Sequence, residues 1–277
     1  MELNRNRIFY LQYISVKFFQ ILPIFFTLDQ NLQFPYMSIV IKRLKSISYI
    51  LLFALSLSSC TQMKIDKLNK KGMELFEQKK FKAANQIFSE ILSLDKDFLP
   101  AYFNRAISNS FLSKNDKALK DLNHIIKIQG YSEEALLNRA IIFENLGKYN
   151  EAIKDYDQIL EVNPHHLQAL HYKGISLYYV GDFNAAIREY DKAIKNGLDV
   201  SGVYYNKGVS LDCLNKYKEA INSYSKAIKI DKKFKQAIYA RGVAYFNIKD
   251  SRLAKANLEY AKKLGHPKAA NMLKRMK

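Results

Sequence analysis

The chain has 277 residues, of which 48% are hydrophobic and 25% charged, values typical of a folded protein and not of a disordered or collagen-like one. Its two cysteines exclude a disulfide framework, and its 10 Gly and 5 Pro exclude a loop-rich chain. The 44 Lys and Arg against 26 Asp and Glu give a formal net charge of +18, so nucleic acid, anionic lipid and acidic proteins are candidate partners.

An apolar stretch over residues 8–28 opens the chain, but two glutamines, a lysine and a proline interrupt it. It is therefore a poor membrane span. Residues 1–36 also separate a better signal-like stretch from the N-terminus, where a signal peptide belongs. We expect that translation begins at Met37 and that residues 1–36 are an over-extended reading frame. The alternative is a genuine first membrane segment.

The second stretch, residues 37–59, has a basic start, an apolar centre of about eleven residues and a small-residue end. That centre is too short for a hydrocarbon core, which needs about 20 residues. The order of the three parts is that of a secretory signal, and Leu-Ser-Ser-Cys at 57–60 resembles the lipobox of bacterial lipoproteins. The resemblance implies a lipoprotein-type signal peptide over 37–59, lipidation of Cys60 and a tether at 60–64, with several acyl chains giving stable anchoring. The alternative is a short membrane-anchor helix with an incidental cysteine.

From residue 65 to 268, small and large apolar residues recur with one fixed period, the 34 positions that separate Gly72 from Ala106. One column is always Gly or Ala, the column twelve positions later is always Ala, and the column four positions beyond that is large. Glycine costs about 1 kcal/mol in a helix interior, so its repetition at one position indicates close approach of a second helix. The columns are Gly72, Ala106, Ala140, Gly174, Gly208 and Gly242; Ala84, Ala118, Ala152, Ala186, Ala220 and Ala254; and Phe88, Leu122, Tyr156, Tyr190, Tyr224 and Leu258.

This period and these columns resemble the tetratricopeptide repeat, with the best copies at 170–195 and 204–229. The resemblance implies an all-α fold, a right-handed superhelical solenoid of about six tetratricopeptide helix pairs over 65–268. Residues 269–277 are expected to form a short C-terminal capping helix, as such arrays need for solubility. Asn109 replaces the large residue usual at its position, which predicts that the second copy is the loosest.

In this family the first helices line a concave groove. The groove positions here are mostly apolar and aromatic, so the charged clamp with which chaperone-binding members grip a terminal carboxylate is not supported. An aromatic groove suits an apolar or amphipathic peptide. We expect the binding site on the concave side of the fourth to sixth repeats. The predicted peptide- or protein-binding residues are His171, Tyr178, Tyr205, Tyr239 and Phe246, together with Phe103 in the second repeat.

The residue before each Gly or Ala of the first column is basic, where the family more often has leucine. One interpretation is a positive stripe that binds anionic lipid, cell-wall polymer, an acidic protein or nucleic acid. The other is that the long side-chain stems cover apolar surface and direct their charges outward. The column consists of Lys71, Arg105, Arg139, Lys173, Lys207 and Arg241.

No catalytic motif appears: the metalloprotease histidine pair, the glycine-rich phosphate loop and the nucleophile elbow are all missing. We interpret the adjacent His165 and His166 as solvated loop residues. Asp155, Asp157 and Asp191 are interpreted as surface charge. The sequence therefore predicts no enzyme activity, no catalytic residue, no cofactor and no metal site.

The expected function is that of a lipid-anchored scaffold or adaptor in the cell envelope, facing the periplasm or the cell surface. Its expected partners are a protein or peptide ligand in the groove and the membrane, through the lipid anchor. The alternative is a basic-surface protein that binds nucleic acid or an anionic polymer, for which affinity would fall steeply with salt. Cys213 is interpreted as partly buried filler, or else as a groove-facing residue.

Overall fold

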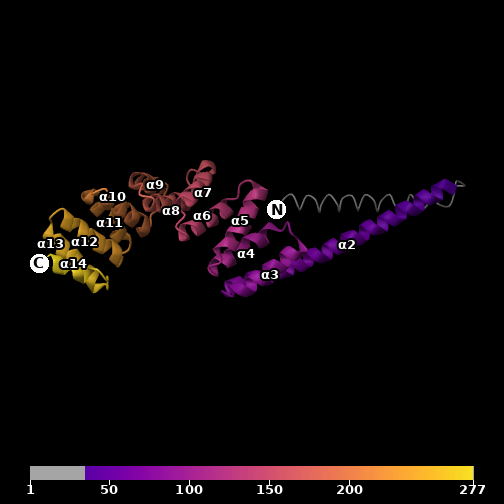
Figure 1. Cartoon of the computed structure of the whole chain (residues 1–277), viewed down its shortest axis with the longest axis horizontal. Coiled ribbons are helices and arrows are strands. Elements are labelled where there is room, and N and C mark those ends of the chain that lie inside the picture. The colour runs from indigo at the N-terminus through magenta and orange to yellow at the C-terminus, as the bar shows by residue number, and fades with distance from the viewer. Residues whose placement is uncertain (1–34, 277) are drawn as a thin grey trace. The chain divides into compact units, whose positions relative to one another are not determined.

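The computed structural model describes residues 35–276, and all of its regular secondary structure in that range is helical (Figure 1). Two compact units divide the chain at residue 68. The expectation that residues 1–36 are not translated concerns a segment that lies, except for its last two residues, outside the described range.

Helix α2 runs without interruption from Pro35 to Glu77, through the predicted signal and into the first repeat. Proline suits a first helical turn because its missing N–H is unpaired there anyway. The first glycine of the helix is Gly72, and no further proline occurs in it. Cys60 is exposed on this helix. None of the helices in the described part of the chain contains a stretch long and apolar enough to cross a membrane.

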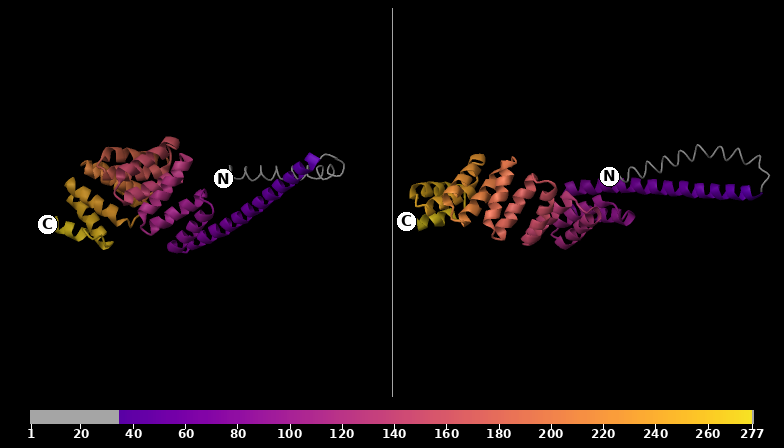
Figure 2. Two further views of the ribbon diagram at one scale, coloured as in Figure 1. Left: turned by 45° about the vertical axis from the view of Figure 1, so that its right-hand side comes forward. Right: turned by 90° about the horizontal axis from the view of Figure 1, so that it is seen from above.

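The second unit, residues 69–277, is a succession of antiparallel helix pairs stacked in chain order (Figures 1 and 2). This all-helical arrangement confirms the predicted solenoid. The last part of α2 forms the first pair with α3 (Phe81–Leu94). The following pairs are α4 (Leu99–Phe111) with α5 (Asn115–Gln129), α6 (Glu133–Asn145) with α7 (Tyr149–Val162), α8 (Leu167–Tyr179) with α9 (Phe183–Lys195), α10 (Ser201–Cys213) with α11 (Tyr217–Ile230), and α12 (Lys235–Asn247) with α13 (Ser251–Lys263), before α14 (Ala269–Arg275).

The turn inside each pair contains one residue in the left-handed backbone region, at positions that are again one period apart. Glycine occupies the position in only two pairs, where left-handed backbone has no steric cost. Lysine, serine or asparagine occupies it in the other four, so those turns are strained. The six residues are Lys79, Ser113, Gly147, Gly181, Asn215 and Lys249, with φ values between 57° and 87°.

The seam between the two helices of a pair is built as the columns predicted. Every residue of the alanine column is fully buried, and the large column sixteen positions after the Gly/Ala column is at most 1% exposed. A Cβ added to Gly174 or Gly208 would lie 2.5 Å from the ring of Tyr190 or Tyr224, respectively. The glycines are therefore required because an aromatic ring of the partner helix occupies the space of their missing side chains.

Candidate functional site

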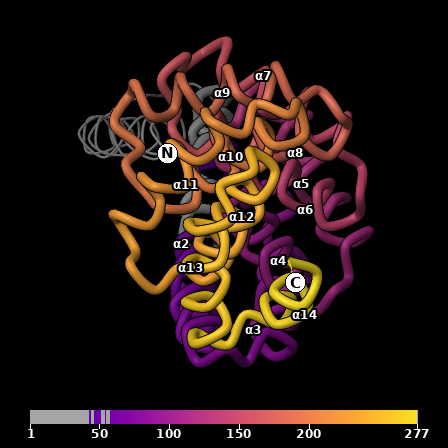
Figure 3. The backbone as a smooth tube through the Cα atoms, turned by 90° about the vertical axis from the view of Figure 1, so that its left-hand side faces the viewer, coloured from indigo at the N-terminus to yellow at the C-terminus, as the bar shows by residue number. Residues whose placement is uncertain are grey.

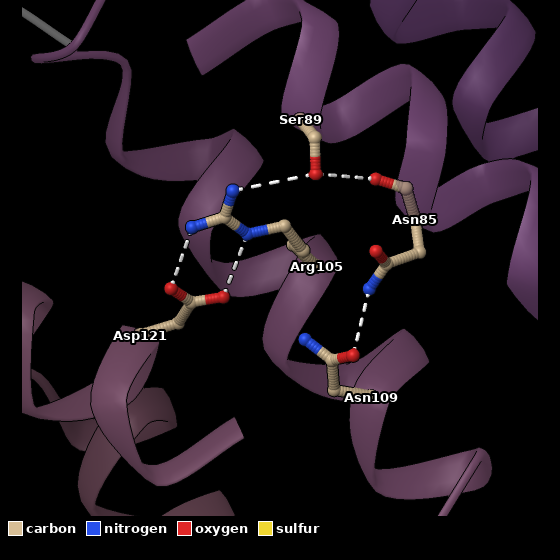
Figure 4. A network of polar contacts seen from close by, with 5 residues as sticks. All are labelled: Asn85, Ser89, Arg105, Asn109 and Asp121. Atoms are coloured by element: carbon tan, nitrogen blue, oxygen red, sulfur yellow. Dashed lines mark hydrogen bonds and ion pairs between the residues drawn. The ribbon is translucent and has the colours of Figure 1, made fainter. Parts of the chain in front are cut away.

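The basic column is tied into the array by hydrogen bonds to second helices. In Figure 4, Arg105 of α4 donates from Nε and Nη2 to the two oxygens of Asp121 on α5, at 2.8 and 2.7 Å. Its Nη1 donates to Ser89 Oγ on α3, at 3.3 Å. Asp121 is buried, and its hydrogen bonds raise the pKa of the Arg105 guanidinium. One side chain thus connects three helices from two repeats.

The same offsets recur along the array: each basic residue reaches the position sixteen residues later, the position sixteen residues earlier, or both. Arg139 pairs with Asp155 and donates to Asn123. Lys173 lies 2.6 Å from Asp157 and 3.7 Å from Glu189.

The last two members of the column have the same partners by position. Lys207 pairs with Asp191. Arg241 donates to the neutral partners Asn257 and Ser225. We call these contacts the basic ladder, which comprises Arg105, Arg139, Lys173, Lys207, Arg241 and their partners.

The basic ladder corrects the interpretation of the column as a free positive stripe. The charges of its last five members do not form a free positive stripe, because carboxylates or neutral polar groups of the second helices hold them. The interpretation of Asp155 as surface charge was also wrong, since Asp155 is 2% exposed and pairs with Arg139. Only Lys71 of the column is exposed, among the residues that the structure describes.

Asn109, which takes the place of the usual large residue, has a polar partner. Asn85 on α3 donates from its side-chain amide to Asn109 Oδ1 at 2.9 Å, and Asn109 is buried (Figure 4). Ser89 donates to the Asn85 carbonyl at 2.8 Å, which links this amide pair to the basic ladder at Arg105. A polar network therefore fills this part of the second repeat.

Tyr178 and Tyr205 are the two predicted binding residues that the structure brings into one neighbourhood, between α8 and α10. Both are half-buried, and burial is the main cause of the raised pKa of each phenol. After burial, the thiol of Cys213 has the largest effect on the pKa of Tyr178, which it raises. The pKa of Tyr205 is raised further by Asp212 and Tyr179. Cys213 is exposed, so its interpretation as buried filler was wrong.

His171 lies deeper in the fourth repeat. Its Nε2 is 3.2 Å from the amide nitrogen of Asn206, and its ring lies 6.0 Å from that of the seam residue Tyr190. Burial lowers the pKa of His171, which favours a neutral imidazole. This histidine therefore packs between neighbouring side chains and projects little from the first-helix face.

The other predicted binding residues lie elsewhere on the array. Phe103 packs on the core of the second and third repeats. Tyr239 stacks on His266 with ring centroids 4.1 Å apart, near the C-terminus. Phe246, at the end of α12, is exposed. The six residues thus do not form one cluster, and Tyr178 with Tyr205 is the pair around which a site can be built.

Two carboxylates on the same first-helix positions were missed as functional candidates. Glu144 accepts a hydrogen bond from Ser176, and burial raises its pKa. Asp212 accepts from Tyr224 Oη at 2.6 Å, and burial raises its pKa to about 6. The second oxygen of Asp212, Oδ1, is buried without a hydrogen-bond partner. The signal in the sequence was their position twelve residues before a seam tyrosine.

The paired histidines have structural contacts and are not simply solvated. His166 accepts the Ala169 N–H at 3.0 Å and so caps α8, and its Nε2 lies 3.3 Å from Glu133. His165 is exposed and lies 3.1 Å from Asn196. No group of three or more metal-ligating side chains is found within the described residues.

Comparisons with known proteins match this fold. Residues 133–166 match the tetratricopeptide repeat model and residues 214–249 match the TPR repeat model. A search of curated protein sequences found no match. Among solved structures, the chain is similar to MamA (22% identity, TM-score 0.56, covering 60% of this chain and 96% of MamA). It is also similar to the C-terminal part of a TPR repeat-containing protein from Cytophaga hutchinsonii (20% identity, TM-score 0.63, covering 72% of this chain and 80% of that one).

A third similar structure is a chain of the APC/C hetero-tetramer Cut9-Hcn1, with 17% identity and a TM-score of 0.60, covering 80% of this chain and 45% of that one. Identities this low establish a shared fold and no shared activity. The matched repeats, the periodic columns and the stacked helix pairs together identify the chain as a tetratricopeptide-repeat protein.

Proposed function

We propose that this protein is a scaffold of the cell envelope, tethered by a lipid at Cys60, that binds a protein or peptide segment on the first-helix face of its later repeats. Tetratricopeptide arrays are suited to protein–protein interaction, and extended solenoid surfaces are the usual binding surfaces of repeat proteins. The proposal places the centre of the binding surface at Tyr178, Tyr179 and Tyr205, which we call the tyrosine patch.

The observation that carries the proposal is the division of the tyrosines into two classes. Tyr190 and Tyr224 on second helices are at most 1% exposed and fill the seams. By contrast, Tyr179 at the end of α8 is 58% exposed, and its ring stacks on Tyr149 at 4.6 Å. Rings held in place by stacking offer large contact area at small entropic cost, which is why aromatic residues dominate binding hot spots.

The polar groups beside the tyrosine patch favour a ligand that donates hydrogen bonds. Besides burial, the charge of Asp212 raises the pKa of Tyr205. The Oδ1 atom of Asp212 is buried and has no hydrogen-bond partner. No lysine or arginine in the described part of the chain forms an ion pair with Asp212. The negative charge of Asp212 favours a ligand that brings an amide or a basic group to the patch, whereas a terminal carboxylate would be repelled.

The binding proposal is tested by Tyr179→Ala. A partner captured by crosslinking in intact cells would be purified and its affinity for the full chain measured. Loss of a hot-spot ring typically costs about 2 kcal/mol, or roughly thirtyfold in affinity. The melting temperature should change little because Tyr179 is exposed. Tyr205→Ala is a less clean test than the sequence suggested, since Tyr205 packs on Phe234 with centroids 5.1 Å apart and its loss would also reduce stability.

Tyr260→Ala is the matched control, because this tyrosine is 43% exposed but lies on the second helix α13. It should bind the partner like the wild type. If Tyr179→Ala binds normally, or if Tyr260→Ala weakens binding equally, the tyrosine patch is not the site.

The tether is tested separately through Cys60→Ala. If Cys60 is the lipid site, this variant should keep its signal segment and should not incorporate labelled fatty acid. Removal of residues 1–36 should leave export intact. Fatty-acid labelling of Cys60→Ala at the wild-type level would exclude lipidation at this position, and loss of export without residues 1–36 would show that the first segment is needed.

A further inference from the structure

The positive charge of this protein is concentrated at its C-terminal end. Residues 65–213 contain 20 Lys and Arg against 20 Asp and Glu, so the first four repeats and α10 are neutral as a block. Residues 214–277 contain 17 Lys and Arg against 4 Asp and Glu, and the difference is a net charge of +13. A general excess of lysine would be spread along the repeats. This charge belongs to α11–α14 and their loops.

The charge at this end is not neutralised within the protein. Among the described residues, no ion pair of a lysine or arginine includes a residue after position 207. Even Arg241, the last member of the basic ladder, has Asn257 where Arg105 and Arg139 have aspartate. Two of the four acids in this region, Asp231 and Asp250, accept backbone N–H groups at helix ends.

Four of the basic residues occupy matching places on two successive second helices. Lys218 and Lys229 on α11 correspond to Arg252 and Lys263 on α13, each exactly one repeat later. All four are exposed. On each helix the two residues are eleven apart, which places them on one face about 16 Å from each other. We call this set the C-terminal basic surface. Figure 3 views the protein from this end, with α11, α13 and α14 labelled.

Further exposed lysines flank the C-terminal basic surface, and few acids dilute it. Glu219 and Glu259 are the only acids on α11 and α13. The flanking residues are Lys226, Lys255, Lys262, Lys268 and Lys274. The surface thus presents a broad area of one sign of charge, and it lies on second helices, away from the first-helix tyrosine patch.

The choice of basic residue indicates the kind of anion. Of the 17 basic residues, 14 are Lys and 3 are Arg. Arginine predominates where phosphates or bases are recognised by bidentate hydrogen bonds, whereas lysine acts as a mobile point charge. Of the aromatic rings on α11 and α13, only that of Tyr260 is exposed, so a stacking platform for single-stranded nucleic acid is lacking in this part of the described chain. A diffuse array of lysines suits an extended anionic surface.

We propose that the C-terminal basic surface binds the anionic phospholipid headgroups of a bilayer. Lysines and arginines close to such a surface are attracted to it, and the attraction decays over a Debye length, which shortens as the salt concentration rises. The proposal requires neither the lipid at Cys60 nor the tyrosine patch. If the lipid is present, the surface provides a second attachment favoured by high effective concentration.

The test compares the full chain, by co-sedimentation, on vesicles of phosphatidylcholine alone and on vesicles that contain phosphatidylcholine and phosphatidylglycerol in a molar ratio of seven to three. Partitioning of the wild type should be at least tenfold stronger onto the anionic vesicles at low salt, and most of this gain should disappear in about 0.5 M NaCl. The fourfold variant Lys218→Gln, Lys229→Gln, Arg252→Gln and Lys263→Gln should lose about tenfold of the anionic preference and keep its partitioning onto neutral vesicles.

The control variant removes the same charge from exposed lysines in the neutral block, by Lys82→Gln, Lys117→Gln, Lys127→Gln and Lys148→Gln. It should retain the preference for anionic vesicles. Equal losses in the two variants, or no anionic preference in the wild type, would overturn the proposal. The proposal would also be overturned if the wild type bound a short DNA duplex more tightly than the anionic vesicles at the same salt concentration, and if the fourfold variant lost that DNA binding. The surface would then serve nucleic acid. If Cys60 carries a lipid, Cys60→Ala should weaken partitioning onto both kinds of vesicle but keep the salt-sensitive preference for the anionic ones. Tyr179→Ala should change neither quantity, which separates this proposal from the proposed function.

Discussion

Arg139 and Asp155 are joined by two hydrogen bonds, from Nε to Oδ2 at 2.8 Å and from Nη2 to Oδ1 at 2.6 Å. The aspartate is buried. Removing one member of a buried pair leaves the other charge without compensation. Asp155→Ala should therefore lower the free energy of unfolding by about 3 kcal/mol, measured by urea denaturation. Asp155→Asn should cost less, since Arg241 and Asn257 already form such a pair.

The matched control for this prediction is the outer pair of Lys207 and Asp191, in which the aspartate side chain is 51% exposed. Exposed ion pairs contribute about 0–1 kcal/mol. Asp191→Ala should therefore change stability by less than Asp155→Ala does. Equal effects of the two substitutions would show that burial does not govern the basic ladder.

Gly208 is expected to be intolerant of a side chain, because Tyr224 lies where the Cβ would be. Gly208→Leu should overpack the seam and lower the free energy of unfolding by about 1–3 kcal/mol. The damage should extend to adjacent repeats while other repeats stay helical, since each repeat contacts mainly its neighbours. A complete two-state loss of circular dichroism at room temperature would contradict this expectation.

Gly202 provides the control in the same helix. A Cβ at Gly202 would meet no atom within 4 Å. Gly202→Ala should therefore stabilise the protein by up to about 1 kcal/mol through helix propensity alone. The melting temperatures of the two variants should move in opposite directions.

The strained turn at Lys249, with φ of 65°, should be improved by glycine. A left-handed residue other than glycine costs about 1–2 kcal/mol, part of which glycine loses again through its greater freedom in the unfolded chain. Lys249→Gly should thus raise the free energy of unfolding by about 0.5–1 kcal/mol. The reverse change at the equivalent turn, Gly181→Lys, should lower it by a similar amount, as thermal unfolding would show.

Asp212 makes stability depend on pH in the direction opposite to that of a salt-bridged aspartate. Burial raises its pKa in the folded protein to about 6, above the value of about 4 in an unfolded chain. The folded state therefore binds the proton more tightly. This contribution is fully present below about pH 4 and is lost as the pH rises through 6. Because the group is partly solvated, we expect a loss of only about 1–2 kcal/mol.

Asp212→Asn tests this pH dependence, because asparagine can still accept the hydrogen bond from Tyr224. The variant should unfold at higher urea concentration than the wild type at pH 8 and at a similar concentration at pH 4.5. A wild type whose stability between pH 5 and 7 has the same slope as that of Asp212→Asn would show that Asp212 does not titrate in this range.

The repeated helix pairs could be predicted because their information is local: a fixed period and small and large residues at fixed offsets determine which faces meet. The basic ladder could not be predicted in the same way, because Arg105 reaches Asp121 and Ser89 only once the register between three helices is set. A signal was nevertheless present, since Asp121, Asp155 and Glu189 each lie sixteen positions after a basic residue.

The candidate site was harder to predict than the fold. Periodicity placed Tyr178, Tyr205 and Tyr239 on first helices, but whether such residues meet depends on what lies between the repeats. His266 occupies the face of Tyr239, whereas Tyr178 lies close to Cys213. The exposure of Cys213 likewise follows from its place at the last turn of α10 and not from its residue type.

The offsets of the basic ladder bear on how such an array can lengthen. The partners of each basic residue lie sixteen positions before or after it. The span from one partner to the other is therefore two positions shorter than one repeat, which is the separation of Arg105 and Arg139. A tandem duplication of any repeat from the second to the sixth would therefore supply the new arginine or lysine with a polar acceptor on either side. Growth by duplication leaves no buried charge unmatched, and an array of this kind can gain or lose copies during evolution without redesign of its interior.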